Sequence, residues 1–218
     1  SQNTITAIYK DDIGIIWLGT YKQGINYLNS NIVQFPYYHH QESNPNGLPY
    51  DDVNQFVEDH FGNIWIGTNG GGLIYFDRKK NTFKQYLHNP NNENNLSSNV
   101  IVSLCIDSEN ILWIGTYTGG LNSFDGKKFT HYRHDDADSG SLANDNVWKI
   151  FEDRKRNLWI GTLGAGLDVL NRKTGRLYNY KNKQETPDIL PSNVISDILQ
   201  DKKGNLWVGT DNGIAVLN

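Results

Sequence analysis

Apolar and polar residues alternate in short runs that recur along the chain. The most regular run is an apolar residue, Trp, a second apolar residue and then Gly-Thr, as in Ile64–Thr68. Alternation with a period of two predicts a β-strand. The run occurs five times, with spacings of 46 or 48 residues between its tryptophans, Trp17, Trp65, Trp113, Trp159 and Trp207. The chain is therefore predicted to be a repeat protein.

A tight turn is expected before each of these strands. An Asp stands six residues before each Trp, at Asp11, Asp59, Asp107, Asp153 and Asp201. Three residues after the Asp comes Gly14, Gly62, Asn110, Arg156 or Gly204. A hairpin with a type I turn followed by a left-handed residue requires positive φ there, which Gly adopts freely and Asn tolerates. Arg156 is expected to be strained by roughly 1 kcal/mol.

Three further strands are expected in each repeat. The first precedes the Asp and begins near Asn3, Asp51, Asn99, Asp145 and Asn193. The third follows the Gly-Thr pair, at residues 24–28, 72–76, 120–124, 166–170 and 213–217. The fourth carries the pairs Phe35/Tyr38, Phe83/Tyr86, Phe129/Tyr132 and Leu177/Tyr180. It is the most polar strand, and Pro36 lies within its first copy, so it is expected at the outer edge.

Four short antiparallel strands in about 48 residues are typical of a β-propeller blade, and no helical periodicity of useful length is present. The prediction is an all-β propeller with blades at approximately 1–47, 48–95, 96–141, 142–189 and 190–218. Four blades are complete, and the fifth lacks its outer strand. The unvarying Gly before each Thr is expected to allow close approach of neighbouring backbones.

The repeat resembles the two-component regulator propeller repeat, whose pattern is roughly Leu-x-x-Asn-x-Val-x-x-Ile-x-x-Asp-x-x-Gly-x-Leu-Trp-Ile-Gly-Thr-x-x-Gly-Gly-Leu. Residues 96–121 match it almost position for position, with Asn110 in place of the turn Gly. The resemblance implies the extracytoplasmic, periplasmic sensor region of a hybrid histidine kinase that detects carbohydrates. Such repeats build seven-bladed propellers. WD and sialidase repeats fit less well, and kelch repeats are a distant second.

Five repeats are fewer than the family architecture has, so the chain is expected to be a piece of a larger propeller. Three arrangements are compatible with the sequence: a closed ring of five blades, an open arc, and an assembly with a second copy. Unpaired blade edges favour self-association.

Composition narrows the classes of partner. The formal net charge is −4, and acidic and basic residues are interspersed without runs. Nucleic acid and membrane insertion are therefore not expected. The single Cys105 is expected to be a small buried residue. The chain has no Met and no long apolar segment, which is typical of a mature or excised piece.

Candidate chemistry is sparse. The recurrent Asp residues are expected to cap turns, and the repeat tryptophans to form the core between blades. None of the six histidines has metal-ligand spacing, and His131, His134, Asp135 and Asp136 are expected to be a solvated rim. Gly70-Gly71-Gly72 is interpreted as a hairpin turn. No catalytic residue, metal or cofactor is predicted.

Residues that break the repeat pattern are the best candidates for ligand binding. Inner-strand and turn positions that vary between copies meet at the mouth of a propeller channel. The candidates are Trp148, Lys149, Ser196, Asp197, Tyr21, Asn69, Tyr117 and Asp211. An aromatic face beside a cation, a hydroxyl and a carboxylate suits a sugar-derived ligand.

Two classes of function remain. The first is a non-catalytic domain that senses a small molecule or oligosaccharide and signals to a kinase, or a related propeller that binds proteins. The second is a propeller glycosidase or lyase using acids such as Asp197 and Asp211. New reducing ends released from candidate polysaccharides would distinguish them.

Overall fold

The computed structural model describes residues 4–28, 37–44, 46–182 and 190–217. These residues form nineteen β-strands and no helix, so within them no helix is long and apolar enough to cross a membrane. The chain divides into two compact units, residues 1–106 and 107–218. Four of its five antiparallel sheets have four strands, and the fifth has three.

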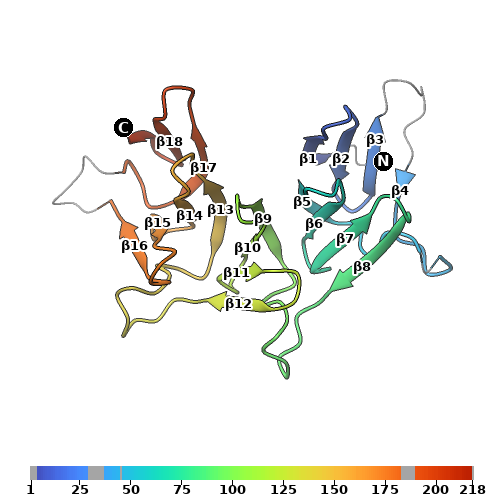
Figure 1. Cartoon of the computed structure of the whole chain (residues 1–218), viewed down its shortest axis with the longest axis horizontal. Helices are drawn as coiled ribbons and strands as arrows, with labels where there is room; N and C mark the ends of the chain where they lie inside the picture. Colours follow the sequence, from blue (N-terminus) through green and yellow to red (C-terminus); the bar gives the residue numbers. More distant parts are fainter. Residues whose placement is uncertain (1–3, 29–36, 45, 183–189, 218) are drawn as a thin grey trace. The chain divides into compact units, whose positions relative to one another are not determined.

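The first unit contains nine strands, drawn from blue to green in Figure 1. One sheet is β1 (Ile5–Lys10), β2 (Ile16–Thr20), β3 (Gly24–Leu28) and β4 (Tyr37–Tyr38), paired in that order. The next is β5 (Val53–Glu58), β6 (Ile64–Thr68), β7 (Leu73–Asp77) and β8 (Thr82–Tyr86), and β9 (Ile101–Ile106) follows. Strand β5 packs beside β1, and β9 packs beside β5.

The second unit contains ten strands. They are β10 (Leu112–Thr116), β11 (Leu121–Phe124) and β12 (Phe129–Tyr132), then β13 (Val147–Glu152), β14 (Leu158–Thr162), β15 (Leu167–Leu170) and β16 (Leu177–Tyr180), then β17 (Ile195–Gln200), β18 (Leu206–Thr210) and β19 (Gly213–Leu217). Strand β17 packs beside β13. The predicted up-and-down order with an outermost fourth strand is confirmed in the sheets ending at β4, β8 and β16. Phe35 and Pro36 lie outside the described residues.

The cores lie between neighbouring sheets. In the first unit Trp17, Val53, Phe56, Ile66 and Phe76 belong to one cluster contributed by two sheets. The leucine that ends each linker, at Leu48, Leu96, Leu142 and Leu190, is buried. Strands β6, β10 and β14 are buried at every position, which explains why three successive apolar residues precede the Gly-Thr pair in each.

In three of the Gly-Thr pairs the Gly lies under a β-branched side chain of the next sheet: Gly19 under Val53, Gly67 under Ile101 and Gly161 under Ile195. A Cβ on Gly67 would lie 2.6 Å from Ile101 Cγ2, and one on Gly161 would lie 2.5 Å from Ile195 Cγ2. Such separations are too short for any side chain, so the glycines are required by packing. The predicted close approach is confirmed, but it is made by a side chain of the neighbouring sheet instead of its backbone.

The turn prediction is confirmed in detail. Asp59 Oδ1 accepts hydrogen bonds from Phe61 N and Asn63 N at 2.9 and 2.8 Å, so the carboxylate caps the turn. The left-handed residue has φ values of 62° at Asn110 and 65° at Arg156. Four of the capping Asp residues also accept a hydrogen bond from the indole N–H of their own repeat: Asp11, Asp107, Asp153 and Asp201.

Two burial predictions are wrong. Trp207 is 39% exposed, whereas Trp17, Trp65, Trp113 and Trp159 are buried. Its face of β18 is open in the part of the chain that the structure describes. Cys105 in β9 is half-buried.

Substitution of Arg156 by Gly is expected to leave the free energy of unfolding unchanged or to raise it by at most about 0.5 kcal/mol. Relief of left-handed strain is worth about 1 kcal/mol, and the freedom of Gly in the unfolded chain offsets about 0.5–1 kcal/mol. Urea unfolding measures the difference. The matched control is Lys155→Gly, one residue earlier, where no positive φ is relieved and stability is expected to fall. An equal loss in both variants would contradict the strain argument.

Candidate functional site

A β-bulge occurs at the same place in four of the first strands. The pairing register shifts between Ile5 and Ala7 in β1, and equivalently in β5, β13 and β17. The residues inside the bulges are Thr6, Asn54, Trp148 and Ser196. A bulge leaves one residue out of the ladder and redirects its side chain, so these positions are free to vary.

In the first unit, bulge side chains bond to the next sheet. Thr6 Oγ1 donates to Val53 O, and Asn54 Nδ2 donates to Ile101 O at 2.8 Å. These hydrogen bonds tie β1 to β5 and β5 to β9. Their role is structural.

In the second unit, the bulge of β13 holds an aromatic side chain. Trp148 is 40% exposed. The next residue, Lys149, forms an ion pair with Asp197 of β17, with Nζ and Oδ1 2.6 Å apart. The structure therefore brings Lys149 and Asp197 together on two adjacent strands, and Trp148 precedes Lys149 in β13. Ser196 occupies the bulge position next to Asp197.

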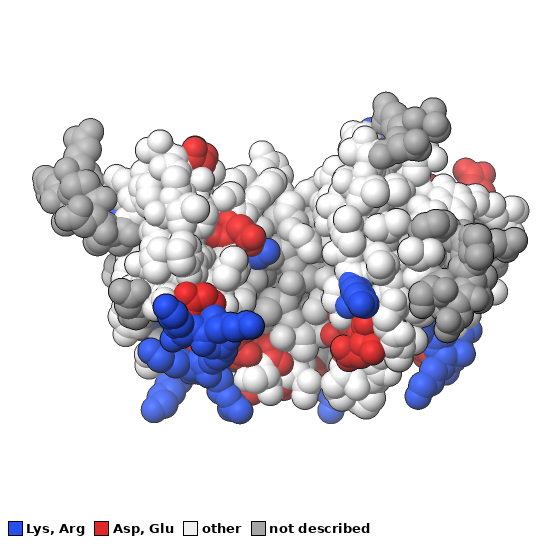
Figure 2. Space-filling view, turned by 90° about the horizontal axis from the view of Figure 1, so that it is seen from above, with Lys and Arg blue, Asp and Glu red and all other residues white. Residues whose placement is uncertain are grey.

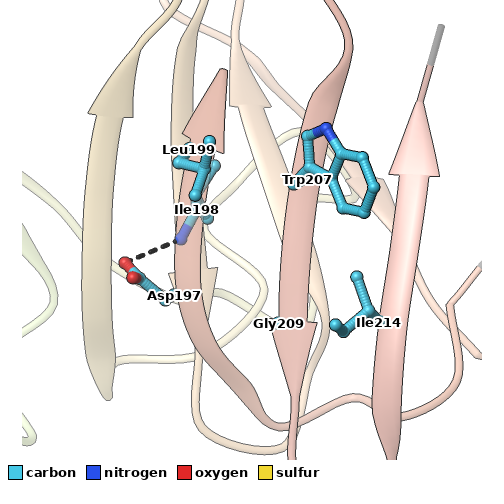
Figure 3. Close-up of a pocket in the computed structure, with 6 residues that line it drawn as sticks. All are labelled: Asp197, Ile198, Leu199, Trp207, Gly209 and Ile214. Carbon is cyan, nitrogen blue, oxygen red and sulfur yellow. Dashed lines mark hydrogen bonds between the residues drawn. The ribbon is translucent and has the colours of Figure 1, made fainter. Parts of the chain in front are cut away.

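The Lys149–Asp197 pair is open to solvent. The side chains are 33% and 61% exposed, and such pairs contribute only about 0–1 kcal/mol to stability. Asp197 Oδ1 also accepts a hydrogen bond from Ile198 N at 2.9 Å (Figure 3). Both groups remain accessible to a polar ligand, which can exchange hydrogen bonds with them at little cost.

A shallow cavity of about 220 Å³ begins at Asp197. Leu199 and Trp207 line it beside Gly209 and Ile214 (Figure 3). Its surface is mainly apolar, and the exposed indole of Trp207 forms one wall. In Figure 3 the carboxylate of Asp197 and the indole of Trp207 point in opposite directions from their strands.

The predicted turn residues of the second unit lie near the starts of β13 and β17. Thr118 N, next to Tyr117, donates to Asn146 Oδ1 at 3.1 Å. Asp211 N donates to Val194 O at 3.3 Å. Tyr117 and Asp211 therefore lie at the same strand ends as Trp148 and Ser196, and both side chains are exposed.

Tyr21 and Asn69 occupy the equivalent turns of the first unit. Tyr21 N donates to Thr4 O at 3.0 Å, and the ammonium of Lys22 lies 4.9 Å from the centre of the Tyr21 ring. Asn69 Nδ2 donates to Asp52 Oδ2 at 3.1 Å. The Asn69 side chain is thus engaged in holding its own turn, whereas Tyr21 presents an open aromatic face.

The histidine-containing segment is a solvated rim, as predicted. His134 Nε2 lies 3.0 Å from Asp136 Oδ1, and its Nδ1 lies 2.7 Å from Leu142 O. Hydrogen bonding to the Leu142 carbonyl and to Asp136 raises the pKa of His134. Across the described residues, no three His, Cys, Asp or Glu side chains gather in a way that would hold a metal ion.

Charged side chains of opposite sign lie near one another on the face shown in Figure 2, and much of that face carries neither sign. Lys and Arg side chains gather in one patch at the lower left of this view, with Asp and Glu side chains beside them.

Sequence reasoning missed two buried arginine clusters. Arg78 pairs with Asp11 and Glu58, each at 2.9 Å. Arg172 pairs with Asp107 and Glu152, each at 2.7 Å. The signal was present in the sequence, because each arginine is the second residue after its third-strand aromatic or leucine, in Phe76-Asp77-Arg78 and Leu170-Asn171-Arg172.

A protein-family model for the two component regulator propeller matches the chain five times, at residues 1–22, 47–70, 95–118, 141–164 and 189–212. Together these segments make up more than half of the chain. No curated protein sequence matches the chain.

Solved structures similar to this chain include the extracellular domains of two hybrid two component systems from B. thetaiotaomicron. The first is 26% identical with a TM-score of 0.82, covering 100% of this chain and 29% of that one. The second is 19% identical with a TM-score of 0.77, covering 99% and 31%. The chain thus spans less than a third of the length of either domain.

Enzymes share the fold as well. Virginiamycin B lyase from Staphylococcus aureus is 15% identical with a TM-score of 0.70, covering 100% of this chain and 71% of the lyase. At this identity the likeness shows the propeller fold alone.

Proposed function

Because the chain belongs to the two-component regulator propeller family, we propose that it is part of the extracytoplasmic sensor region of a hybrid two-component kinase. Support comes from the family segments in all five repeats and from the likeness to an extracellular domain of such a system at 26% identity. In this proposal the domain lies in the periplasm, binds a carbohydrate-derived ligand and passes the signal to a kinase.

The observation that carries the ligand proposal is the group formed by Trp148, Lys149 and Asp197. Sugars bind where an aromatic face lies beside hydrogen-bond donors and hydrogen-bond acceptors. The indole supplies the face, the ammonium donates, and the carboxylate accepts. Their exposure and the 2.6 Å ion pair leave them accessible and already oriented.

We propose a non-catalytic role for this group. Hydrolysis of a glycosidic bond requires two carboxyl groups, one of them a general acid with a raised pKa. Asp197 is instead exposed and paired with Lys149. A glycosidase or lyase remains the alternative, and release of new reducing ends from polysaccharides would favour it.

Self-association through open sheet faces is a further part of this proposal. Leu199, Trp207 and Ile214 are exposed on the β17–β19 sheet, and Ile8 is exposed on β1. A contiguous exposed patch of large apolar side chains often marks a surface that another molecule covers.

Substitution of Trp148 or Asp197 by Ala in the intact sensor is expected to weaken binding of an active oligosaccharide by about tenfold or more. The reason is the loss of the stacking face or of the acceptor. Calorimetric titration measures the affinity. Matched controls are Tyr178→Ala, an exposed aromatic on β16, and Asp136→Ala, an exposed carboxylate on the rim. If the folded Trp148→Ala and Asp197→Ala variants bind as tightly as the parent and the two controls, the ligand site lies elsewhere.

A further inference from the structure

A second pocket lies between two sheets of the second unit, away from the first strands that carry Trp148 and Asp197. Its volume is about 210 Å³, and it opens between β10–β12 and the end of β15. The side chains that define it are Trp113, Ser123, Asp125, Lys128, Tyr132 and Arg172. None of them belongs to the group assigned above to ligand sensing.

The pocket exists because small side chains replace large ones. In the first unit, Tyr27 pairs with Trp17 across β2 and β3, and the two rings lie 5.3 Å apart. In the second unit the register partner of Trp113 is Ser123. The side chains of the facing sheet are also smaller in the second unit. Leu170 and Leu177 stand there at the positions that Phe76 and Phe83 occupy in the first unit.

In the first unit these aromatic residues occupy the same space. Tyr38 lies 6.0 Å from Tyr27, 5.3 Å from Phe76 and 5.6 Å from Phe83, measured between ring centres. The equivalent Tyr132 lies 5.6 Å from Trp113, and Ser123, Leu170 and Leu177 stand at the positions of Tyr27, Phe76 and Phe83. The second unit has therefore exchanged an aromatic cluster for an open, partly polar pocket.

The pocket walls are held in place by hydrogen bonds. Asp107 accepts from the indole of Trp113 at 2.7 Å. Asp125 Oδ1 accepts from the backbone N–H groups of Lys127 and Lys128 at 2.8 and 2.7 Å. Arg172 is fixed by Asp107, by Glu152 and by the carbonyl of Arg156. Fixed walls reduce the entropy lost when a ligand binds.

The lining chemistry selects a neutral ligand with many hydroxyl groups. Ser123, Thr130 and Tyr132 offer hydroxyls, Asp125 accepts, and Lys128 donates. Arg172 is already neutralised by two carboxylates, so it is not available to bind an anion. The volume is below the roughly 300–1,000 Å³ of pockets for drug-sized ligands, which limits the occupant to a single small ring.

We propose that this pocket binds one neutral monosaccharide or similar small polyol, in contact with the Trp113 and Tyr132 rings. It is a site separate from the Trp148 group, and it does not depend on the sensor proposal. In an interface between two sheets, an occupant would contact both sheets at once.

The test is a titration of the full chain with D-glucose, D-galactose, D-mannose and L-arabinose, followed by the NMR signals of the Trp113 indole N–H and the Ser123 and Thr130 amides. At least one neutral sugar is expected to shift these signals in the millimolar range. D-glucuronate and D-glucosamine, which are charged, are expected to bind more weakly.

Two variants keep the test decisive. Ser123→Tyr combined with Leu170→Phe rebuilds the packing of the first unit and is expected to abolish the shifts. Lys128→Ala, at an exposed residue whose loss leaves the core intact, is expected to weaken binding by about tenfold. Trp148→Ala is expected to leave binding here unchanged, which separates this site from the other.

The proposal is overturned if no neutral sugar shifts the pocket signals, if a charged sugar binds better than every neutral one, or if Lys128→Ala binds as tightly as the parent. Retention of binding in a folded Ser123→Tyr/Leu170→Phe variant would overturn it as well.

Discussion

Replacement of Trp113 by Ala is expected to lower the free energy of unfolding by about 3–5 kcal/mol. The side chain is only 4% exposed, and its loss leaves a cavity beside Tyr132. It also removes the indole N–H that Asp107 accepts at 2.7 Å. Denaturant unfolding followed by circular dichroism measures the difference. If the m-value, the slope of the free energy against denaturant concentration, is unchanged, the whole effect should appear as a lower denaturant concentration at the midpoint.

The matched control is Trp207→Ala. Trp207 occupies the same position of its repeat and donates to Asp201 at 3.0 Å, but it is 39% exposed. Both variants therefore remove the same side chain and the same type of hydrogen bond, and the main difference is burial. A smaller loss is expected for Trp207→Ala. If the two variants lose the same free energy, burial between sheets is not the source of the tryptophan contribution.

Replacement of Arg172 by Met is expected to cost about 3 kcal/mol. Removal of one partner from a buried ion pair costs roughly 3–5 kcal/mol because the other charge remains unpaired. The side chain of Asp107 is fully buried, whereas that of Arg172 is 21% exposed, which places the expectation at the lower end of that range. The same unfolding measurement applies.

The matched control for this variant is Arg176→Met. Arg176 pairs with Asp138 at the same distance, 2.7 Å, but the side chains are 54% and 47% exposed. Solvent screens such a pair, so a loss of about 0–1 kcal/mol is expected. Equal losses in the two variants would show that burial does not decide the strength of these pairs.

The cost of Arg172→Met is also expected to depend on pH. Burial tends to raise the pKa of Asp107, but hydrogen bonds from Trp113, Arg172 and two backbone N–H groups outweigh it and hold the pKa below 3.8. A carboxyl group whose pKa is lower in the folded state than in the unfolded state stabilises the protein at pH values above its unfolded-state pKa. This stabilisation is lost as the pH falls through the folded-state pKa. The difference between parent and variant should therefore shrink below about pH 4.

Local chemistry made much of the fold predictable. Three features of each repeat depend only on neighbours within a few positions. They are the capping Asp, the left-handed residue at Asn110 or Arg156, and the run in which each Trp stands between two apolar residues. The order of strands within a sheet follows from the same short hairpins. These features need no knowledge of how one sheet packs against the next.

The errors and omissions concern contacts between sheets. The sequence around Trp207 is nearly the same as that around Trp159, so it does not reveal that only one of the two faces is covered. Pairing of Arg172 with Asp107 joins residues 65 positions apart. The pocket beside Trp113 depends on the combined size of Ser123 and Leu170 on facing sheets, which a reading of either strand alone does not give.

The bulge in the first strand has a consequence for how this protein changes over evolutionary time. Its central residue stands outside the pairing register, so a new side chain there leaves the backbone hydrogen bonds of the strand intact. Thr, Asn, Trp and Ser all occupy this position in one chain. Most mutations that alter recognition also erode folding. At Trp148, whose side chain is exposed, a single substitution can instead change the recognition surface while the scaffold stays under unchanged selection, whereas Thr6 and Asn54 are held by their hydrogen bonds to the next sheet.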